Sequence, residues 1–301
     1  MSAQQVLYDK PGPKAIFRDK IYNVVFTLAF LALIAWIIYT ANQRGVFNDR
    51  WSVLWDPPRN QTAWDVWSSL LITGLWGTLK PVLIAIPIVM VLATVITVVR
   101  TSTKWWARVP ARVVTEVFRG IPVLLVMYFG VIALEMKPLH AVVLGLVVYN
   151  MAVVAEILRA GIAALPNGQR EAGLSIGLTP LQTTMQIQLP QAVRIMLPAL
   201  VSQAVVLLKD SALGFVIAYT ELLTTGRRNY NYFGEESKVV FILVIAAMYI
   251  GINMLVSRLA HWLERRLGSR SKVVVAEAPK VPGALTAGGV GLEARTPDDR
   301  R

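Results

Sequence analysis

Four long stretches without Asp, Glu, Lys or Arg are the feature that most limits how this chain can fold. They cover residues 21–43, 81–99, 138–155 and 239–257. A helix needs about 20 apolar residues to cross the hydrocarbon core of a bilayer, and it satisfies its backbone hydrogen bonds within the segment. These four runs therefore predict membrane-spanning helices.

Two further apolar stretches contain charged residues, one at about 113–134 and the other at about 193–222. With them we count six spans, and the expected fold class is an all-α polytopic membrane helix bundle. The expected limits of the spans are 21–40, 70–99, 113–134, 139–164, 193–222 and 238–263. Each of Pro87, Pro122 and Pro198 falls within a span, where a proline removes a helix hydrogen bond and favours a kink.

Composition agrees with a membrane protein and excludes several kinds of site. Charged residues make up 16% of the 301 residues and the mean hydropathy is +0.54, whereas soluble domains carry about 25% charged residues. There is no Cys, which excludes disulfides and thiolate metal sites. His140 and His261 lie far apart, so we expect no metal site. The net charge of +12 is explained by the loops of a membrane protein, and we expect no nucleic-acid partner.

The distribution of Lys and Arg predicts the orientation of the chain. Basic residues gather before the first span, after the second and after the sixth. With six spans these three places share one face, which the positive-inside rule makes cytoplasmic. We therefore expect a multi-pass protein of the cell membrane with both termini in the cytoplasm. Residues 1–20 form its cytoplasmic N-terminal segment, and residues 266–301 form a disordered cytoplasmic tail. The loops expected outside are 41–65 and 224–237.

A half-polar segment lies between the fourth and fifth spans, on the cytoplasmic face by this topology. We call residues 167–190 the polar segment. Glu171 follows a turn-like start at Asn167-Gly168, and an acid in a first helical turn favours the helix dipole. Gly177 can adopt a positive φ and let the chain change direction. Thr179-Pro180, with Gln182 three residues after the threonine, forms a capping-box pattern that predicts the start of a second helix.

The second of these helices has an apolar stripe and no charged residue. Leu181, Met185 and Leu189 are spaced i, i+4 and i+8, and Leu189-Pro190 is expected to end the helix. A helix that lies on a membrane surface usually carries Lys and Arg on its polar face. The uncharged face favours burial in a groove of a cytoplasmic partner protein.

The spacing of residues in the polar segment resembles the coupling motif of permease subunits of binding-protein-dependent ABC importers. The matching residues are Glu171-Ala172-Gly173, Gly177 and Ile187-Gln188-Leu189-Pro190. In that family the motif forms a short helix that sits in a cleft of the ATPase subunit. Gly173 departs from the usual Ala and is expected to loosen the helix by about 1 kcal/mol or less. The resemblance implies an ATPase-coupling set of Glu171, Ala172, Gly173, Gly177, Thr179, Pro180, Ile187, Leu189 and Pro190.

Further segments resemble the polar amino-acid subfamily of these permeases, and the overall pattern resembles actinobacterial glutamate permeases. They are Gly77-Thr78-Leu79 and the segments 116–122, 156–161, 189–192, 207–211 and 221–222. The resemblance covers a permease core of about 66–265 with the coupling segment 167–190 inside it, and it implies the fold of a type I ABC importer permease. Residues 21–65 would add a first transmembrane helix and an outer loop.

The resemblance also implies the partners of this chain. They are an ATPase subunit, a second and different permease chain, an extracellular solute-binding protein and the membrane lipid. The chain has no Gly-x-x-x-x-Gly-Lys-Ser/Thr loop, so it cannot bind ATP in the P-loop way. We therefore expect a transporter subunit that is no enzyme and binds no cofactor, with ATP and Mg at the ATPase. The expected function is ATP-driven import of polar amino acids, with glutamate as the expected substrate.

Two acid–base pairs within the expected spans need a reason, because a charge at the bilayer centre costs about 2.5–3.5 kcal/mol on insertion scales. In Glu116/Arg119 and Glu156/Arg159 the partners are three residues apart on one helix face. One reading is a self-neutralising brace of the bundle. The other is a lining of the substrate path, in which Glu156 contacts the ammonium of an amino acid.

Lys209 and Asp210 lie in the middle of the fifth span. Adjacent residues point about 100° apart on a helix, so the two cannot face the same partner. Either Lys209 faces the path and binds a substrate carboxylate, or the pair forms an interhelical salt bridge. The candidates for the substrate path are Arg119, Glu156, Arg159, Lys209 and Asp210.

Two other classes of protein are alternatives to a permease of this family. An ion-gradient-driven secondary amino-acid transporter would explain the buried charges, although it would not explain the spacing within the polar segment. A membrane enzyme would need a metal cluster, an activated nucleophile or a pair of carboxylates, and the sequence suggests no catalytic residue.

Overall fold

The computed structural model describes residues 12–43 and 49–268, and all regular structure in this part of the chain is helical. The all-α fold class is confirmed. The helices are α1 Pro13–Gln43, α2 Ala63–Ser68, α3 Trp76–Thr101, α4 Trp105–Gly120, α5 Val123–Ile132, α6 Pro138–Ala163, α7 Asn167–Ser175, α8 Pro180–Thr183, α9 Leu189–Ile195, α10 Leu197–Ser211, α11 Leu222–Phe233 and α12 Lys238–Gly268.

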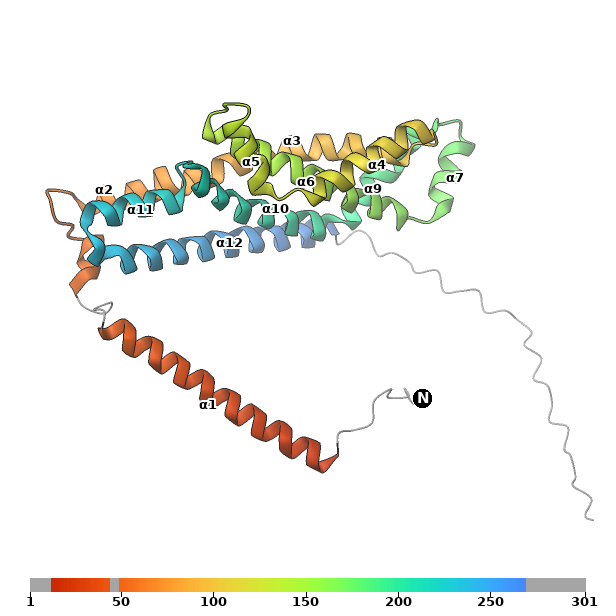
Figure 1. The fold of residues 1–301 in the computed structure, drawn as a ribbon. Coiled ribbons are helices and arrows are strands. Elements are labelled where there is room, and N and C mark those ends of the chain that lie inside the picture. Colours follow the sequence, from red (N-terminus) through yellow and green to blue (C-terminus); the bar gives the residue numbers. More distant parts are fainter. Residues whose placement is uncertain (1–11, 44–48, 269–301) are drawn as a thin grey trace, which may run out of the picture.

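Long helices form a bundle with distinct elements at its two ends. In Figure 1, α3, α6, α10 and α12 extend along the bundle, α7 lies at one end, and α2 and α11 lie at the other. We call these the α7 end and the α11 end. The bundle core forms around α6, whose buried side chains pack with residues of α3, α5, α9 and α10. A second apolar cluster, which includes Leu70, Leu222 and Phe241, closes the α11 end.

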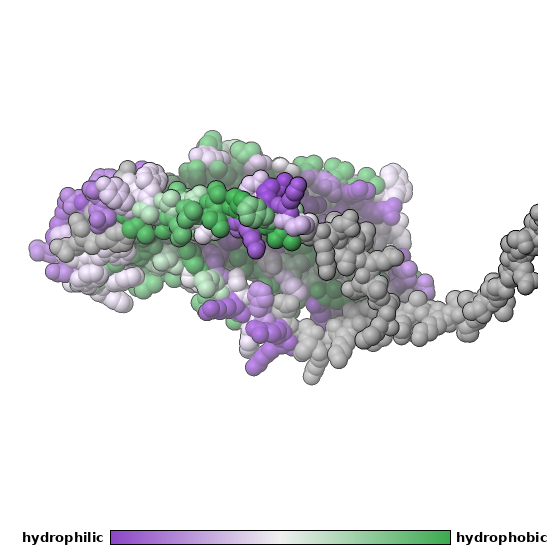
Figure 2. Space-filling view, turned by 90° about the horizontal axis from the view of Figure 1, so that it is seen from below, coloured by the Kyte–Doolittle hydropathy of each residue, from purple (hydrophilic) through white to green (hydrophobic). Residues whose placement is uncertain are grey.

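The number of spans agrees with the count of about six. Five helices in the described part are long and apolar enough to cross a membrane, and a bent pair makes a sixth if it counts as one span. Seen from below in Figure 2, hydrophobic residues cover the middle of that face and hydrophilic residues gather at the α11 end. An apolar face of this kind suits contact with lipid.

The third span is not the continuous helix expected over 113–134. It consists of α4 and α5, whose axes differ by 91°. The break falls at Ile121, which has the extended angles φ −86° and ψ 124° because the residue before a proline is driven out of the helical region. Pro122 then precedes α5. The pair is sharply bent, so Pro122 separates two helices where a kink was expected.

The fifth span is shorter at both ends than the expected 193–222. α9 ends at Ile195, and the apolar span covers Leu197–Ile217. Pro198 lies at the start of α10 and causes no internal kink, since a proline in the first turn removes no helix hydrogen bond. After Ile217 the chain turns at Ala218, which has φ 57°. The expected outer loop 224–237 is also corrected, because most of it forms α11.

The terminal elements differ from the expected limits as well. α1 begins at Pro13, within the expected N-terminal segment 1–20, and none of its residues is buried. In Figure 1 it lies apart from the bundle. α12 extends to Gly268, so residues 266–268 of the expected tail are helical. The prediction of disorder from residue 269 lies outside the described residues, as does the structure of residues 1–11.

Candidate functional site: the polar segment and the membrane charges

The first helix of the polar segment, α7, ends in a tight turn at Gly177. This residue has φ +88°, in the left-handed region that glycine adopts without strain. The Gly177 amide donates to the Leu174 carbonyl at 3.0 Å, and the Leu178 amide donates to the Gly173 carbonyl at 3.2 Å. These two bonds form a Schellman motif, which satisfies the last carbonyls of α7. The change of direction that the sequence predicts is present.

The second helix begins with the capping box that the sequence predicts. The Gln182 amide donates to Thr179 Oγ1 at 3.3 Å, and the Thr179 amide donates to Gln182 Oε1 at 2.9 Å. Pro180 occupies the first helical turn, where its missing N–H costs nothing. Two orphan donors are thus satisfied at the point where the chain re-enters a helix.

Three local predictions in this segment are wrong. α7 begins at Asn167, so Glu171 lies beyond the first turn. The helix dipole favours an acid only within that first turn. The helix does not end at Leu189-Pro190: α8 continues through a π-helical stretch, Thr184–Gln188, into α9. Wider π turns shift the helical register, so Leu189 is buried while Leu181 and Met185 are exposed. The single apolar stripe is therefore split between two faces.

Gly173 has a packing role in this structure. It is the buried residue of α7. A Cβ built on it would lie 2.7 Å from Thr183 Cγ2 and 3.0 Å from Ile187 Cδ1, too close for unshifted side chains. The absence of a side chain lets α7 pack against the second helix. The departure from Ala therefore has a local physical reason.

The outer surface of the polar segment is apolar and open. Leu174, Ile176, Leu181 and Met185 are exposed, Ile176 by 76%. Glu171, Ala172, Thr179 and Pro190 are also exposed, and Ile187 is half-buried. Thr183, Thr184 and Gln188 turn inward and are buried. An exposed group of large apolar side chains with polar neighbours is typical of a protein interaction site.

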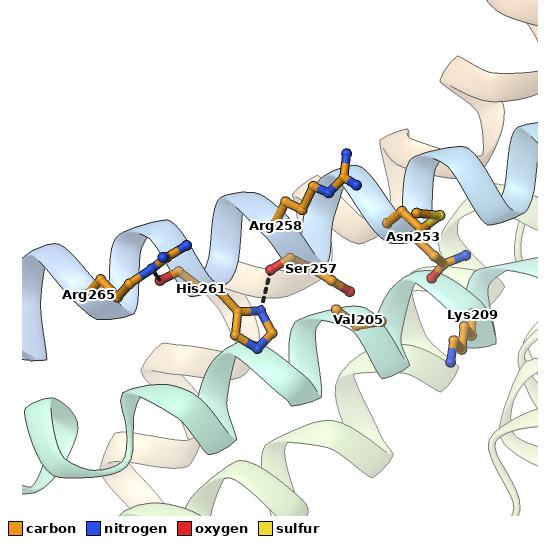
Figure 3. Close-up of a pocket in the computed structure, with 8 residues that line it drawn as sticks. Val205, Lys209, Asn253, Ser257, Arg258, His261 and Arg265 are labelled. Atoms are coloured by element: carbon orange, nitrogen blue, oxygen red, sulfur yellow. Dashed lines mark hydrogen bonds between the residues drawn. The ribbon is translucent and has the colours of Figure 1, made fainter.

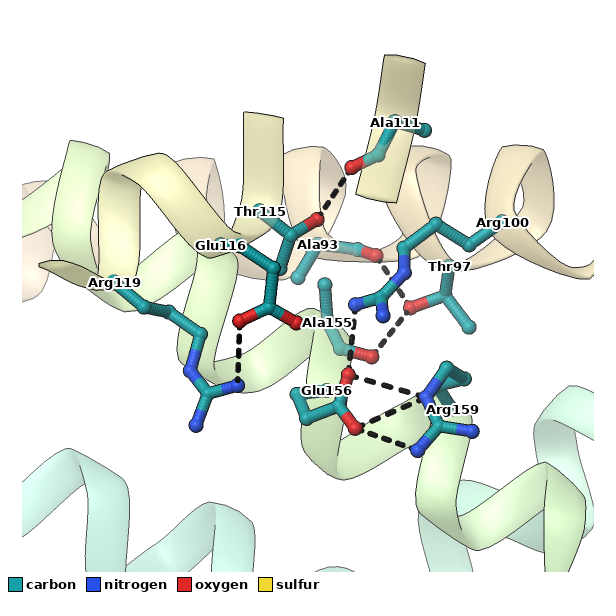
Figure 4. Close-up of polar contacts among 10 residues, drawn as sticks. All are labelled: Ala93, Thr97, Arg100, Ala111, Thr115, Glu116, Arg119, Ala155, Glu156 and Arg159. Carbon is teal, nitrogen blue, oxygen red and sulfur yellow. Dashed lines mark hydrogen bonds and ion pairs between the residues drawn. The ribbon is translucent and has the colours of Figure 1, made fainter. Parts of the chain in front are cut away.

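Glu156 forms two ion pairs, one of them with a residue that the sequence reading did not select. Its carboxylate lies 2.6 Å from Arg159 Nη2 and 2.7 Å from Arg100 Nη1, which comes from α3 (Figure 4). Beside this group, Thr97 Oγ1 donates to the Ala155 carbonyl at 3.1 Å. Arg100 directly follows the charge-free run 81–99, and Glu156 directly follows the run 138–155. This shared position at the ends of two spans could have indicated that they pair.

The second predicted pair is weaker. Arg119 Nη1 lies 3.9 Å from Glu116 Oε2, and both side chains are largely exposed, by 41% and 56%. They belong to α4, whereas Glu156 and Arg159 belong to α6. Both acid–base pairs therefore form, as expected if they brace the bundle. Of the two, only the pair on α6 is also joined to another helix, because Glu156 binds Arg100 of α3. The path reading for Arg119, Glu156 and Arg159 stays a prediction.

Lys209 and Asp210 form no ion pair among the described residues. Lys209 is exposed and Asp210 is half-buried. Lys209 lines a cavity of about 690 Å³ between α10 and α12. The interhelical salt bridge expected as one alternative for this pair is thus absent between described residues of this chain. That the two residues line the substrate path stays a prediction.

Two sequence patterns far apart in the chain meet at the α11 end. The Tyr219 hydroxyl donates to the Gly77 carbonyl at 3.0 Å, and the Leu222 amide donates to Thr78 Oγ1 at 3.2 Å. Glu221 is fully buried and caps α11: its carboxylate accepts from the Leu223 and Thr224 amides and, at 2.6 Å, from the Tyr249 hydroxyl. These bonds fix α11 against α3 and α12.

Comparison with known families identifies the chain. The model of the family described as "binding-protein-dependent transport system inner membrane component" matches residues 85–269. The chain belongs to this family. The match runs from α3 past the end of α12 and includes the whole polar segment. A member of this family is an inner-membrane component of a transport system, so the exposed polar segment and the membrane charges belong to a transport subunit.

Three relatives support this assignment. The glutamate transport system permease protein GluD of Corynebacterium glutamicum is 38% identical over 256 residues, which are 81% of this chain and 92% of that protein. The probable glutamine ABC transporter permease GlnP of Bacillus subtilis is 35% identical over 55% of this chain and 81% of its own length. The glutamate/aspartate import permease GltK of Escherichia coli O157:H7 is 31% identical over 66% and 97%.

Two solved structures share the fold of this chain. A crystal structure of an amino acid ABC transporter with histidines aligns with a TM-score of 0.58 and 32% identity, over 66% of this chain and 95% of that chain. The inward-facing MetNI methionine ABC transporter aligns with a TM-score of 0.55 and 18% identity, over 66% and 96%. The fold is therefore that of a type I ABC importer permease.

Proposed function

We propose that this chain is the permease subunit of an ATP-driven importer of polar amino acids, and that its substrate is glutamate. The observation that carries the proposal is the polar segment: two capped helices, held close by Gly173, present an open apolar surface at one end of a membrane bundle. The family membership and the 38% identity to a glutamate permease support the same function.

The polar segment is the contact through which a separate ATPase acts. A helix pair that is locally rigid can transmit a displacement, and this pair has both a Schellman motif and a capping box. ATP and Mg bind at the ATPase, and its closure moves the polar segment. The sharp bend at Pro122 gives the bundle a hinge between α4 and α5. Alternating access then follows from rocking of the helices.

The α7 end faces the cytoplasm, and the α11 end faces outward. The positive-inside rule supports this orientation, because Arg100, Lys104, Arg108 and Arg112 lie at the α7 end of α3 and α4. α2 and α11 are then available to an extracellular solute-binding protein. A second, homologous permease chain completes the pathway around the core of about 66–265, since five or six spans are few for one.

Substitutions in the polar segment test the coupling. Gly177→Pro places a ring that needs φ near −65° at a residue with φ +88°, and Glu171→Lys reverses an exposed charge. Each is expected to uncouple ATP hydrolysis from transport while the chain still enters the membrane. Unchanged uptake in both variants would contradict the docking role.

A purification identifies the assembly and the substrate. The tagged chain, extracted gently from its native membrane, is expected to bring an ATPase, a second permease and a solute-binding protein, identified by mass spectrometry. The binding protein is then titrated with glutamate, glutamine and aspartate. Uptake that stops on ATP depletion but persists with an uncoupler supports the importer, and the reverse pattern supports an ion-driven transporter.

A further inference from the structure

A cavity between α10 and α12 collects positive charge along its length. It has a volume of about 690 Å³, and six polar or basic residues line it: Lys209, Asn253, Ser257, Arg258, His261 and Arg265. No acidic side chain of the described residues lines it. Its basic groups form no ion pair in the described part of the chain. The cavity therefore has an excess of positive charge that the described residues do not neutralise.

The polar residues form a continuous row along one helix. Asn253, Ser257, His261 and Arg265 are spaced i, i+4, i+8 and i+12, so each is a neighbour of the next on α12, in a row that winds by about 120° around the helix. Figure 3 shows Asn253 and Lys209 toward one end of the cavity and His261 and Arg265 toward the other. Asn253 lies inside the apolar span Glu235–Leu259, and Arg265 lies beyond it. The row thus leads from within the membrane to the α7 end.

The inner end of the cavity offers both polarities of hydrogen-bonding group. Lys209 donates, and Asn253 Oδ1 is a buried acceptor with no partner among the described groups. Asn253 Nδ2 is bound to the Tyr249 carbonyl at 2.7 Å, which fixes the direction of the amide. An unpaired buried acceptor is costly, and a small shift of this side chain would present it to an ammonium group of a ligand in the cavity.

We infer that this cavity is the site from which an acidic amino acid leaves toward the cytoplasm. Lys209 binds a carboxylate, Asn253 Oδ1 accepts from the α-ammonium, and Arg258, His261 and Arg265 attract the anion toward the α7 end. The inference rests on the proposed function, which supplies the substrate class. The inference adds to the candidate residue Lys209 the other residues of a binding site and a route from that site to the cytoplasm.

A small soluble anion fits this arrangement better than a phospholipid headgroup. Headgroups lie at the membrane interface, where Arg265 could reach one, whereas Lys209 and Asn253 lie within the apolar spans. A lysine that faced lipid at this depth would cost about 2.5–3.5 kcal/mol. Lys209 lines the cavity instead, and an anionic substrate there would pair with its charge.

The test measures uptake of radiolabelled glutamate and ATP hydrolysis by the complete importer in proteoliposomes. Lys209→Met is expected to lower glutamate uptake at least about tenfold, the effect of losing one charged hydrogen bond. Lys209→Arg, which keeps the charge, is expected to retain most of it. Asn253→Leu is expected to reduce uptake as well. Lys80→Gln is the matched control, because Lys80 is another exposed lysine in a membrane helix, outside the cavity.

Each outcome has a distinct meaning. If wild type imports another amino acid but no glutamate, the proposed substrate fails. If wild type imports glutamate and Lys209→Met imports it equally well, this inference is overturned alone. Equal loss in Lys209→Met and Lys209→Arg, in complexes that still assemble, overturns it too, because charge is then not the cause. Disappearance of the Lys209 effect in vesicles of phosphatidylcholine alone assigns the cavity to anionic lipid and overturns it as well.

Discussion

Arg100 Nη1 on α3 lies 2.7 Å from Glu156 Oε2 on α6, and the Arg100 side chain is only 6% exposed. Because the same carboxylate also pairs with Arg159, one acid is shared between two guanidinium groups. Their shared position near the α7 end joins the two helices that form the centre of the bundle. The stability of this end therefore depends more on Glu156 than on either arginine alone.

Glu156→Gln tests this dependence. It leaves a buried arginine without a carboxylate, and breaking a buried pair in this way costs roughly 3 kcal/mol. A clear drop in the Tm of the detergent-solubilised complex is expected. Glu116→Gln is the matched control, since it removes the acid of another i, i+3 pair whose side chains are exposed, and such pairs contribute about 1 kcal/mol or less. Equal drops in Tm would contradict the account.

Gly173→Ala tests whether the polar segment needs close packing. Alanine favours a helix by up to about 1 kcal/mol, but overpacking a tight contact costs about 1–3 kcal/mol, and the new Cβ would lie 2.7 Å from Thr183 Cγ2. Packing is expected to dominate, so amide hydrogen exchange over 167–188 should speed up. Adding Thr183→Ala removes the nearest obstructing atom, Thr183 Cγ2, and leaves the flexible end of Ile187 at 3.0 Å, so it is expected to slow exchange again. If the single variant exchanges more slowly than wild type, the packing role is wrong.

Thr179→Ala tests the capping box at the start of α8. Loss of an N-cap costs about 1 kcal/mol, so the ATPase rate of the complex, measured without the solute-binding protein, is expected to fall severalfold while the complex stays assembled. The chain offers a matched control in Thr62, which forms the same kind of capping box with Asp65 at the start of α2. Thr62→Ala is expected to leave the ATPase rate unchanged. The same fall in both variants would show a general loss of stability.

Gly77→Ala tests the contact between α3 and the turn before α11. A Cβ at Gly77 would collide with the Thr220 carbonyl oxygen, and backbone cannot move aside as a side chain can. A lower yield of folded protein and a Tm reduced by several degrees are expected. Gly251→Ala, on α12 with nothing within 4 Å of the new Cβ, should fold normally. A normal Tm for Gly77→Ala would contradict the close contact.

Local chemistry explains which parts of the fold were predictable from sequence. Charge-free runs gave the spans, because the membrane imposes their length and polarity. The Gly177 turn and the Thr179–Gln182 capping box were predictable because their hydrogen bonds connect residues that are close in sequence.

The features that the sequence did not predict depend on contacts between residues far apart in the chain, which the spacing of residues does not reveal. α11 lies where an outer loop was expected, because Glu221 caps it and Tyr249, far along the chain, holds that carboxylate. The break at Ile121 could have been read from the following Pro122, but its angle of 91° depends on packing. Arg100 looked like a loop residue, although its partner on α6 makes it a buried one.

The central claim is that the exposed face of the polar segment contacts an ATPase subunit, and cross-linking tests it most directly. The chain has no cysteine, so Leu181→Cys creates a single reactive thiol on that face, and Leu223→Cys, exposed on α11, serves as the control. In native membranes a short thiol-to-amine cross-linker is expected to join the Leu181→Cys chain to the ATPase and to leave the Leu223→Cys chain unlinked to it. A Leu181→Cys chain that never links to an ATPase in a transport-competent complex would contradict the account.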